Sequence, residues 1–316
     1  MVRHLILLLS VLLPASSSVT PVPPAAARAI DERFIGRWDI AIAAPDGEKP
    51  SWLEIDHSGR DAMVGRFVGI VGSARPISMI AVSGDSLSFS IPHQWEEGNG
   101  DLIVRGRLQG NTLSGVMTFP DGKSYQWTAV RAPRLYRGTT RSWGAPIRLL
   151  HANNLGGWHA SGPTNQWTVN HGVLSSPRSG SNLVTDRTFG DFKLHVEFRY
   201  PKESNSGVYL RGRHEVQIQD DYGNDPAPDR FSGVYGFISP IDIAARPAGQ
   251  WQTYDITLIG RIVSVVANGK QVISNQEIPG ITGGALDSHE GEPGPIFLQG
   301  DHGPIEYRNI VITPAR

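Results

Sequence analysis

Polar side chains in one segment of this chain recur at the two-residue spacing that places them on one face of a β-strand. Glu215, Gln217 and Gln219 alternate with two apolar residues, so the polar groups point one way and the apolar groups point into the core. Three polar side chains in a row do not fill a core, so they predict the lining of a groove. A carboxylate flanked by amides suits acid–base chemistry, and it suits equally the hydrogen bonding of ligand hydroxyl groups.

Two charged residues extend this candidate site. Asp220 follows directly after the polar run as a second carboxylate, and we predict a catalytic role for it beside Glu215. Arg211 lies on the preceding segment. Its guanidinium either binds ligand hydroxyl groups, holds Glu215 ionised, or forms a structural ion pair.

A histidine in a glycine-flanked turn is the next candidate for acid–base chemistry. His302, in the sequence LQGDHG, can act as an acid, a base or a metal ligand near neutral pH, or it can bond to the backbone. Asp301 beside it, with His289 and Glu290 in the preceding loop, offers ligands for a divalent cation such as calcium or manganese. Because no spacing here is diagnostic of a metal, the sequence establishes no cofactor.

Three more residues are predicted to bind a substrate. Tyr222 and Tyr235 each lie next to a glycine in a loop or at a strand edge, where a ring offers a flat face on which a ligand stacks. Gln299 ends the strand that leads to the histidine turn. Other aromatic residues of this half, such as Trp167 and Trp251, are expected in the core.

The composition excludes several kinds of site and partner. There are no cysteines, so disulfides, thiolate metal sites and cysteine nucleophiles are ruled out. The 29 basic and 30 acidic residues nearly balance, which argues against nucleic acid as a partner. A basic start, an apolar run over Leu5–Leu13 and small residues after it predict a signal peptide and spacer over residues 1–29. We therefore expect a periplasmic or secreted protein with no membrane span.

The elements that position the candidate residues are predicted to be β-strands throughout. Residues 33–132 alternate in about eight short runs, one of them Ile77–Val82, separated by turns such as Asp46-Gly47. This pattern predicts a small antiparallel β-barrel or sandwich. Residues 133–144 are predicted as a linker. Residues 145–316 show about thirteen strands, including Gly233–Ile238, and predict two packed sheets in a jelly-roll sandwich.

The second half resembles a known family. The segments FKLHVEFRYPKESNSGVYLRGRHEVQIQDDYG, PAGQWQTYDITLIGRIVSVVANGKQV and GPIFLQGDHGPIEYRNIVITP follow one another in the order and spacing of the 3-keto-disaccharide hydrolase domain family. The resemblance covers nearly all of residues 146–313 and implies a concanavalin-like jelly roll. In the first half, Gly36-Arg37-Trp38 before a meander resembles the start of lipocalin-like barrels.

The resemblance implies an enzyme that cleaves glycosides already oxidised to a ketone at C3. The ketone acidifies the C2 proton, so a base can remove it, the enolate can expel the C1 substituent, and water can then add. Such an enzyme needs a base, an acid and a group that stabilises the enolate oxygen. A separate 3-dehydrogenase would supply the ketone upstream.

Two other functions compete with this hypothesis. Laminarinase-type glucanases of the same fold carry a strand of the pattern E-x-D-x-x-E, whose two glutamates flank the scissile bond. Here the pattern keeps Glu215 but has Gln217 and Asp220 at its other positions, which disfavours a two-carboxylate glycosidase. A non-catalytic carbohydrate-binding module or lectin remains the alternative, since the fold serves both purposes.

Overall fold

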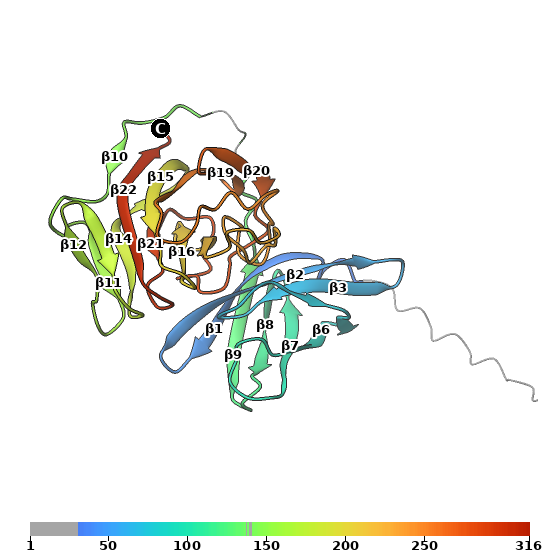
Figure 1. Cartoon of the computed structure of the whole chain (residues 1–316). Coiled ribbons are helices and arrows are strands. Elements are labelled where there is room, and N and C mark those ends of the chain that lie inside the picture. Colours follow the sequence, from blue (N-terminus) through green and yellow to red (C-terminus); the bar gives the residue numbers. More distant parts are fainter. Residues whose placement is uncertain (1–30, 137, 139–140) are drawn as a thin grey trace, which may run out of the picture.

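The computed structural model describes residues 31–136, 138 and 141–316, and the regular elements within these residues are all β-strands (Figure 1). The prediction of an all-β fold is therefore confirmed. The signal peptide predicted over residues 1–29 lies outside the described residues. Within them, no helix is long and apolar enough to cross a membrane.

The first nine strands form one antiparallel sheet, here called the N-terminal sheet. Its strands follow the order β4-β3-β2-β1-β9-β8-β7-β6-β5. They are β1 (Gly36–Ala44), β2 (Gly47–Ser58), β3 (Ala62–Val68), β4 (Arg75–Ile77), β5 (Ala81–Ser83), β6 (Ser86–Pro92), β7 (Asp101–Gln109), β8 (Thr112–Thr118) and β9 (Ser124–Arg131). Alternate residues of each strand point into one apolar core. Trp38 at the start of β1 is fully buried there, and its indole nitrogen donates to the carbonyl of Phe34 over 3.0 Å.

The predicted single strand Ile77–Val82 is wrong, and the reason lies in how the sheet curls. The structure divides the segment into β4, which pairs with β3, and β5, which pairs with β6. These two strands are the opposite edges of the sheet. Since only three residues join them, an extended chain spans little more than ~13 Å between the edges. The edges therefore approach each other, and the sheet nearly closes on its core.

The remaining thirteen strands form two sheets, here called the C-terminal sandwich. One sheet follows the order β12-β13-β22-β15-β18-β19-β20, with β10 paired to β22, and the other follows β11-β14-β21-β16-β17. The first eight of these strands are β10 (Ile147–Arg148), β11 (Trp158–Ser161), β12 (Thr168–Asn170), β13 (Val173–Ser176), β14 (Asn182–Phe189), β15 (Phe192–Arg199), β16 (Asn205–Leu210) and β17 (His214–Gln219). The last five are β18 (Gln252–Ile259), β19 (Ile262–Ala267), β20 (Lys270–Glu277), β21 (Gly294–Leu298) and β22 (Ile305–Pro314). One large apolar cluster fills the space between the two sheets.

Local sequence signals account for part of this architecture. Asn268 and Gly269 join β19 to β20 with φ angles of 51° and 82°, which a two-residue hairpin turn requires. The predicted strand Gly233–Ile238 is wrong, because this segment makes only isolated bridges. It runs along the free edge of β17, where Gln217 N donates to the carbonyl of Gly233 over 2.9 Å. The four-residue strand β11 was not predicted, because its alternation is too short to detect.

The N-terminal sheet packs against loops of the C-terminal sandwich (Figure 1). Trp52 and Val68 form an apolar cluster with Ile281, and the Trp52 ring meets Phe237 edge-on with 5.3 Å between ring centroids. Backbone also pairs across this interface, since Gly284 N donates to the carbonyl of Ile70 over 2.9 Å and a Cβ at Gly283 would overlap the backbone of Gly72. The two parts of the chain therefore meet through close backbone contact as well as through side chains.

A buried cluster of charged groups lies at the same interface. Asp39 on β1 is hydrogen-bonded to Glu290 of the sandwich, which forms an ion pair with Arg261. Asp39 Oδ1 and Glu290 Oε1 are buried and have no other partner among the described residues, so a proton between the two oxygens satisfies both. Burial and the nearby charge of Glu290 raise the pKa of Asp39, and burial raises that of Glu290.

This shared proton makes the stability of the interface depend on pH. A carboxyl whose pKa is raised by folding stabilises the folded state at low pH, and this contribution is lost as pH rises through the raised pKa. We expect the melting temperature of the wild type to fall by several degrees between pH 6 and pH 9. In Asp39→Asn the amide donates permanently to Glu290. The fall in melting temperature between pH 6 and pH 9 should therefore be at most half as large as in the wild type, as measured by thermal unfolding monitored by circular dichroism. Equal pH dependence in both proteins would contradict the shared proton.

Candidate functional site

The carboxyl group of Glu215 is the centre of the candidate site. Glu215 lies on β17, pairs directly with Tyr209 on β16, and points away from the core of the sandwich. Its carboxylate occupies the space above Gly207, where any Cβ would overlap Oε1. Strand β16 thus accommodates the carboxylate by having no side chain at this position. Only 3% of Glu215 is exposed, so the predicted open groove is a nearly closed polar site at this point.

One hydroxyl group holds the Glu215 carboxylate. Tyr209 Oη lies 2.9 Å from Glu215 Oε2 and 2.9 Å from the carbonyl oxygen of Gly283. Burial raises the pKa of Glu215 to about 8, although the hydrogen bond from Tyr209 lowers it. When Glu215 is ionised, Tyr209 donates to it. When Glu215 is protonated, it donates to Tyr209, which then donates to Gly283. The same three groups therefore satisfy either protonation state.

Two amide side chains adjoin this carboxylate. The amide of Gln217 lies 3.2 Å from Glu215 Oε1 and donates to it when its nitrogen faces the carboxylate. Gln299 N donates to the carbonyl of Gly207, so this residue lies directly beside the gap that Glu215 fills. Gln299 is 8% exposed, and its Oε1 has no partner among the described residues. A buried acceptor without a donor is a position where a ligand hydroxyl would bind.

His302 and Asp301 form an ion pair near Glu215. His302 Nδ1 lies 2.6 Å from Asp301 Oδ1, and this hydrogen bond raises the pKa of the imidazole. The charge of His302 lowers the pKa of Glu215, and the charge of Glu215 raises the pKa of His302, so each group lies within the electrostatic field of the other. Asn182 orders the turn, because its side-chain oxygen accepts from Gly300 N over 2.8 Å. The site thus holds one carboxyl with a pKa raised by burial and one imidazole with a pKa raised by a neighbouring carboxylate.

A tryptophan from the N-terminal sheet reaches the same site. Tyr235 N donates to the carbonyl of Glu215 over 3.1 Å, and the Trp95 side chain lies close enough to the Tyr235 hydroxyl to lower its pKa. Burial and the charge of Glu215 raise the pKa of Tyr235, so its hydroxyl stays protonated. Trp95 lies between β6 and β7, in a segment with no alternation or motif that could have marked it in the sequence. Tyr235 was predicted as a binding residue, whereas Trp95 and Gly207 were not.

Asp220 is not brought to Glu215. Residues five apart lie on opposite faces of a regular strand, so an E-x-D-x-x-E pattern needs a bulge before its last glutamate can share the face of the first. The pairing of β16 with β17 has no register shift, and Asp220 Oδ2 instead accepts from Glu203 N over 3.0 Å. The catalytic role predicted for Asp220 is therefore not supported. Gln219 lies at the same end, where its side-chain oxygen accepts from Asn205 over 3.2 Å, and the neighbouring Tyr222 is 61% exposed.

Arg211 is also placed apart from the Glu215 carboxylate. It occupies the turn between β16 and β17 with a φ of 54°, and it is 1% exposed. Its guanidinium donates to the carbonyl of Gly260 over 2.7 Å and lies 3.4 Å from His214 Nε2. Its burial and its hydrogen bond to Gly260 fit the structural role among the alternatives predicted for it.

The three residues predicted as metal ligands lie in separate surroundings. Glu290 is buried with Arg261 at the interface, exposed His289 lies 3.7 Å from Asp287, and Asp301 pairs with His302. Across residues 31–136, 138 and 141–316, no group of three His, Asp or Glu side chains is placed to hold a metal ion. The predicted ligand set is therefore wrong, since the fold disperses residues that are close in sequence.

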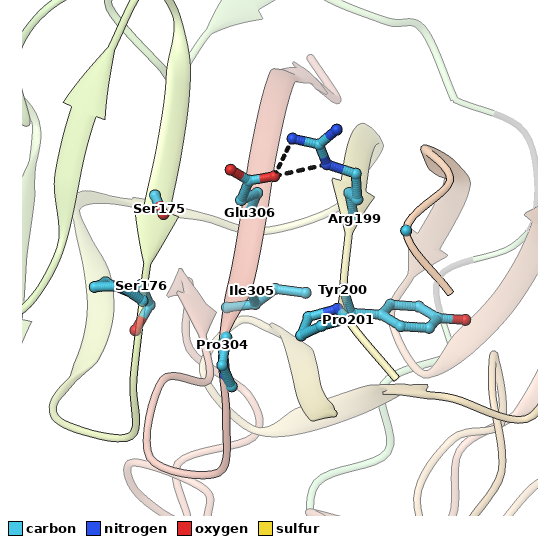
Figure 2. Close-up of a pocket in the computed structure, with 10 residues that line it drawn as sticks. Ser175, Ser176, Arg199, Tyr200, Pro201, Pro304, Ile305 and Glu306 are labelled. Carbon is cyan, nitrogen blue, oxygen red and sulfur yellow. Dashed lines mark hydrogen bonds and ion pairs between the residues drawn. The ribbon is translucent and has the colours of Figure 1, made fainter. Parts of the chain in front are cut away.

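A sizeable cavity lies elsewhere on the sandwich. Figure 2 shows a cavity of about 350 Å³ lined by residues of β13, β15 and β22 and by neighbouring loops. Arg199 and Glu306 pair across it, with 2.7 Å between Nε and Oε2. Neither Glu215 nor His302 lines this cavity, so its volume is no guide to the acid–base site.

Comparisons with known proteins match the part of the chain that forms the C-terminal sandwich. The profile of the 3-keto-alpha-glucoside-1,2-lyase-like domain matches residues 145–313. No curated protein sequence matches the chain. Among solved structures, a candidate glycosyl hydrolase from Parabacteroides distasonis is 27% identical, with 57% of this chain and 93% of that chain covered and a TM-score of 0.45. Another candidate glycosyl hydrolase from the same organism is 24% identical. The match covers 54% of this chain and 98% of that chain, with a TM-score of 0.42. A β-glucanase from Bacillus licheniformis is 12% identical. The match covers 55% of this chain and 99% of that chain, with a TM-score of 0.37.

The bond from Tyr209 to Glu215 predicts a measurable pKa change. Replacing Tyr209 by Phe removes the donor to the ionised form, so the pKa of Glu215 should rise by roughly one unit, since hydrogen bonds to charged groups contribute ~1.5–3 kcal/mol. Carbon-13 NMR titration of labelled glutamate carboxyls would measure this, with Glu215→Gln identifying the signal. Tyr200→Phe is the matched control, because the Tyr200 hydroxyl is buried without a partner among the described residues. If the titration midpoint of Glu215 is the same in Tyr209→Phe as in the wild type, Tyr209 does not stabilise the ionised carboxylate.

Proposed function

The chain belongs to the 3-keto-alpha-glucoside-1,2-lyase-like family, and from this premise we propose that it cleaves glycosides whose sugar carries a ketone at C3. Membership of this family indicates a glycoside-acting hydrolase. The observation that carries the finer proposal is the environment of Glu215. A single buried carboxyl that is held by Tyr209, with an imidazole whose charge acts on its pKa, suits proton abstraction next to a ketone.

The first half of the reaction is an elimination. Ionised Glu215 takes the proton from C2, and the electron pair of that C–H bond moves into the C2–C3 bond to give an enolate at the C3 oxygen. The enolate then reforms the ketone and expels the C1 oxygen, to which protonated His302 gives its proton. The leaving alcohol and an unsaturated 3-keto sugar result. A carboxylate with a pKa near 8 is well matched to this step. It is a stronger base than an ordinary carboxylate, and a useful fraction of it is ionised near neutral pH.

The second half is the reverse process with water. Neutral His302 removes a proton from water, whose oxygen adds to C1, and protonated Glu215 returns its proton to C2. The sum of the two halves is hydrolysis of the glycosidic bond. Both catalytic groups end in their starting protonation states, so the cycle needs no further reagent.

Neighbouring groups suit the charge that develops on the substrate. The pKa of Tyr235 is raised by burial, so its hydroxyl keeps a proton that can be donated to the enolate oxygen. The free Oε1 of Gln299 accepts from a sugar hydroxyl. These contacts strengthen as negative charge moves from Glu215 to the substrate.

The competing functions differ in what they require of the site. A retaining glucanase needs a second carboxylate beside Glu215, but Gln217 occupies the neighbouring place on this face and Asp220 is turned away. A carbohydrate-binding module needs no titratable pair, so the Glu215–His302 arrangement favours an enzyme. We further propose that residues 1–29 direct export to the periplasm or medium, and that a separate dehydrogenase supplies the ketone.

The enzyme is tested with 3-keto substrates. The purified protein should release 3-keto-glucose from 3-keto-trehalose or 3-keto-lactose, and Glu215→Gln and His302→Ala should each lower kcat at least about tenfold because each removes a proton carrier. Glu306→Gln and His159→Ala are matched controls, since both residues lie in surface ion pairs of the sandwich. If no 3-keto-glycoside is cleaved while sugar binding is measurable, the protein is a binding module.

The pH dependence tests which group is the base. With a nitrophenyl 3-keto-glucoside, whose leaving group needs no proton, the rate depends only on ionised Glu215. We expect log kcat/KM to rise with pH at a slope near one and to level near pH 8, where the buried carboxyl is half ionised. A profile that levels near pH 4.5 would assign the base to an exposed carboxylate instead.

A further inference from the structure

Trp95 is a large side chain that the N-terminal sheet leaves exposed at the site. It is 68% exposed, although it lies in contact with two other groups. Its ring edge lies about 3.0 Å from where a Cβ at Gly72 would stand, and its side chain is near enough to the Tyr235 hydroxyl to affect the pKa of that group. An apolar ring held in one orientation while its face stays open to solvent is the usual form of a sugar-stacking platform.

The loop that carries Trp95 is rigidly held. Glu96 pairs with Arg75 over 2.5 Å, and their side chains are only 6% and 11% exposed. The same carboxylate accepts from the backbone of Gln94 over 2.8 Å and from that of Trp95 over 3.3 Å. The Gln94 side chain in turn accepts from Ser73 N over 3.0 Å. A buried ion pair and three hydrogen bonds thus fix Trp95 before any ligand arrives, which limits the entropy lost on binding.

The same loops are joined to the support of Glu215. The backbone of Gly72, beneath the Trp95 ring, presses on that of Gly283, and the Gly283 carbonyl accepts from the hydroxyl of Tyr209 that holds Glu215. On the other side, Gly236, next to Tyr235, packs on Ser73. Trp95 therefore has a fixed position relative to the acid–base groups, although it comes from the other half of the chain.

We infer that Trp95 and Tyr235 form a subsite for the leaving group of the substrate, supplied by the N-terminal sheet and selective for leaving groups with a flat face. This inference rests on the proposed function of the Glu215 site. The chemical class it selects is a glycoside whose C1 substituent is an aromatic ring or a second pyranose, each of which presents a flat C–H or π surface to the indole. The N-terminal sheet thereby determines specificity while the sandwich carries the chemistry.

Kinetics with two leaving groups tests the subsite. In Trp95→Ala, kcat/KM for an aryl 3-keto-glucoside should fall at least about tenfold, mainly through KM, while that for methyl 3-keto-glucoside should change less than about twofold. Trp95→Phe keeps a flat ring and should recover most of the loss. Met79→Ala is the control, because Met79 is 69% exposed and lies between β4 and β5 of the same sheet. Equal effects of Trp95→Ala on both substrates would overturn the inference.

A binding measurement separates this inference from the proposed reaction. Calorimetric titration with unoxidised phenyl glucoside and with trehalose requires no turnover. If no 3-keto-glycoside is cleaved but Trp95→Ala weakens binding of phenyl glucoside at least about tenfold, the proposed reaction fails and the platform stands. If cleavage is observed but binding and KM are the same in wild type and Trp95→Ala, the reaction stands and the platform is refuted.

Discussion

The hydroxyl of Tyr209 lies between the carboxylate of Glu215 and the carbonyl of Gly283, and this short chain of hydrogen bonds connects the main features of the molecule. A carboxyl that is almost fully buried is costly in its charged form unless a donor reaches it. Tyr209 is that donor, and the missing side chain at Gly207 provides the volume that the carboxylate needs. The tyrosine ring is fixed in turn by stacking on Phe297 at 4.3 Å between centroids.

The far end of this chain of bonds extends into the N-terminal sheet. A Cβ at Gly283 would overlap the backbone of Gly72, so this position tolerates no side chain, and an apolar cluster around Trp52 lies at the same interface. The Asp39–Glu290–Arg261 cluster adds buried polar groups to the interface. Since buried charges stabilise only when their partners are correctly placed, such a cluster fixes one relative position of the two parts more than it adds stability. The candidate site depends on that position.

The two acid–base groups of the site have raised pKa values for different physical reasons. Removal from water raises the pKa of Glu215, so its neutral form is favoured until pH 8 or so. The neighbouring Asp301 raises the pKa of His302, so its charged form is favoured. Opposite preferences in two neighbouring groups are what a reaction needs when one proton is removed and another is delivered. Neither shift requires a second carboxylate in contact with Glu215, which separates this site from that of a retaining glycosidase.

The sequence by itself determined the features that depend on local spacing. Alternation predicted an all-β chain, Asn268-Gly269 predicted its hairpin, and two-residue spacing placed Glu215 and Gln217 together on one face. Strict alternation also puts Asp220 on the opposite face, and only a bulge, which the fold lacks, would have brought it to Glu215.

The tertiary structure decided everything that depends on distant segments. Arg211 is buried because the turn that carries it packs beneath Gly260, and Glu290 serves the interface because Asp39 and Arg261 converge on it. Trp95 reaches Tyr235 from 140 positions away in the chain, although its own segment shows no pattern. Periodicity reports which face of its own strand a side chain occupies, and it carries no information on which other element will lie against that face.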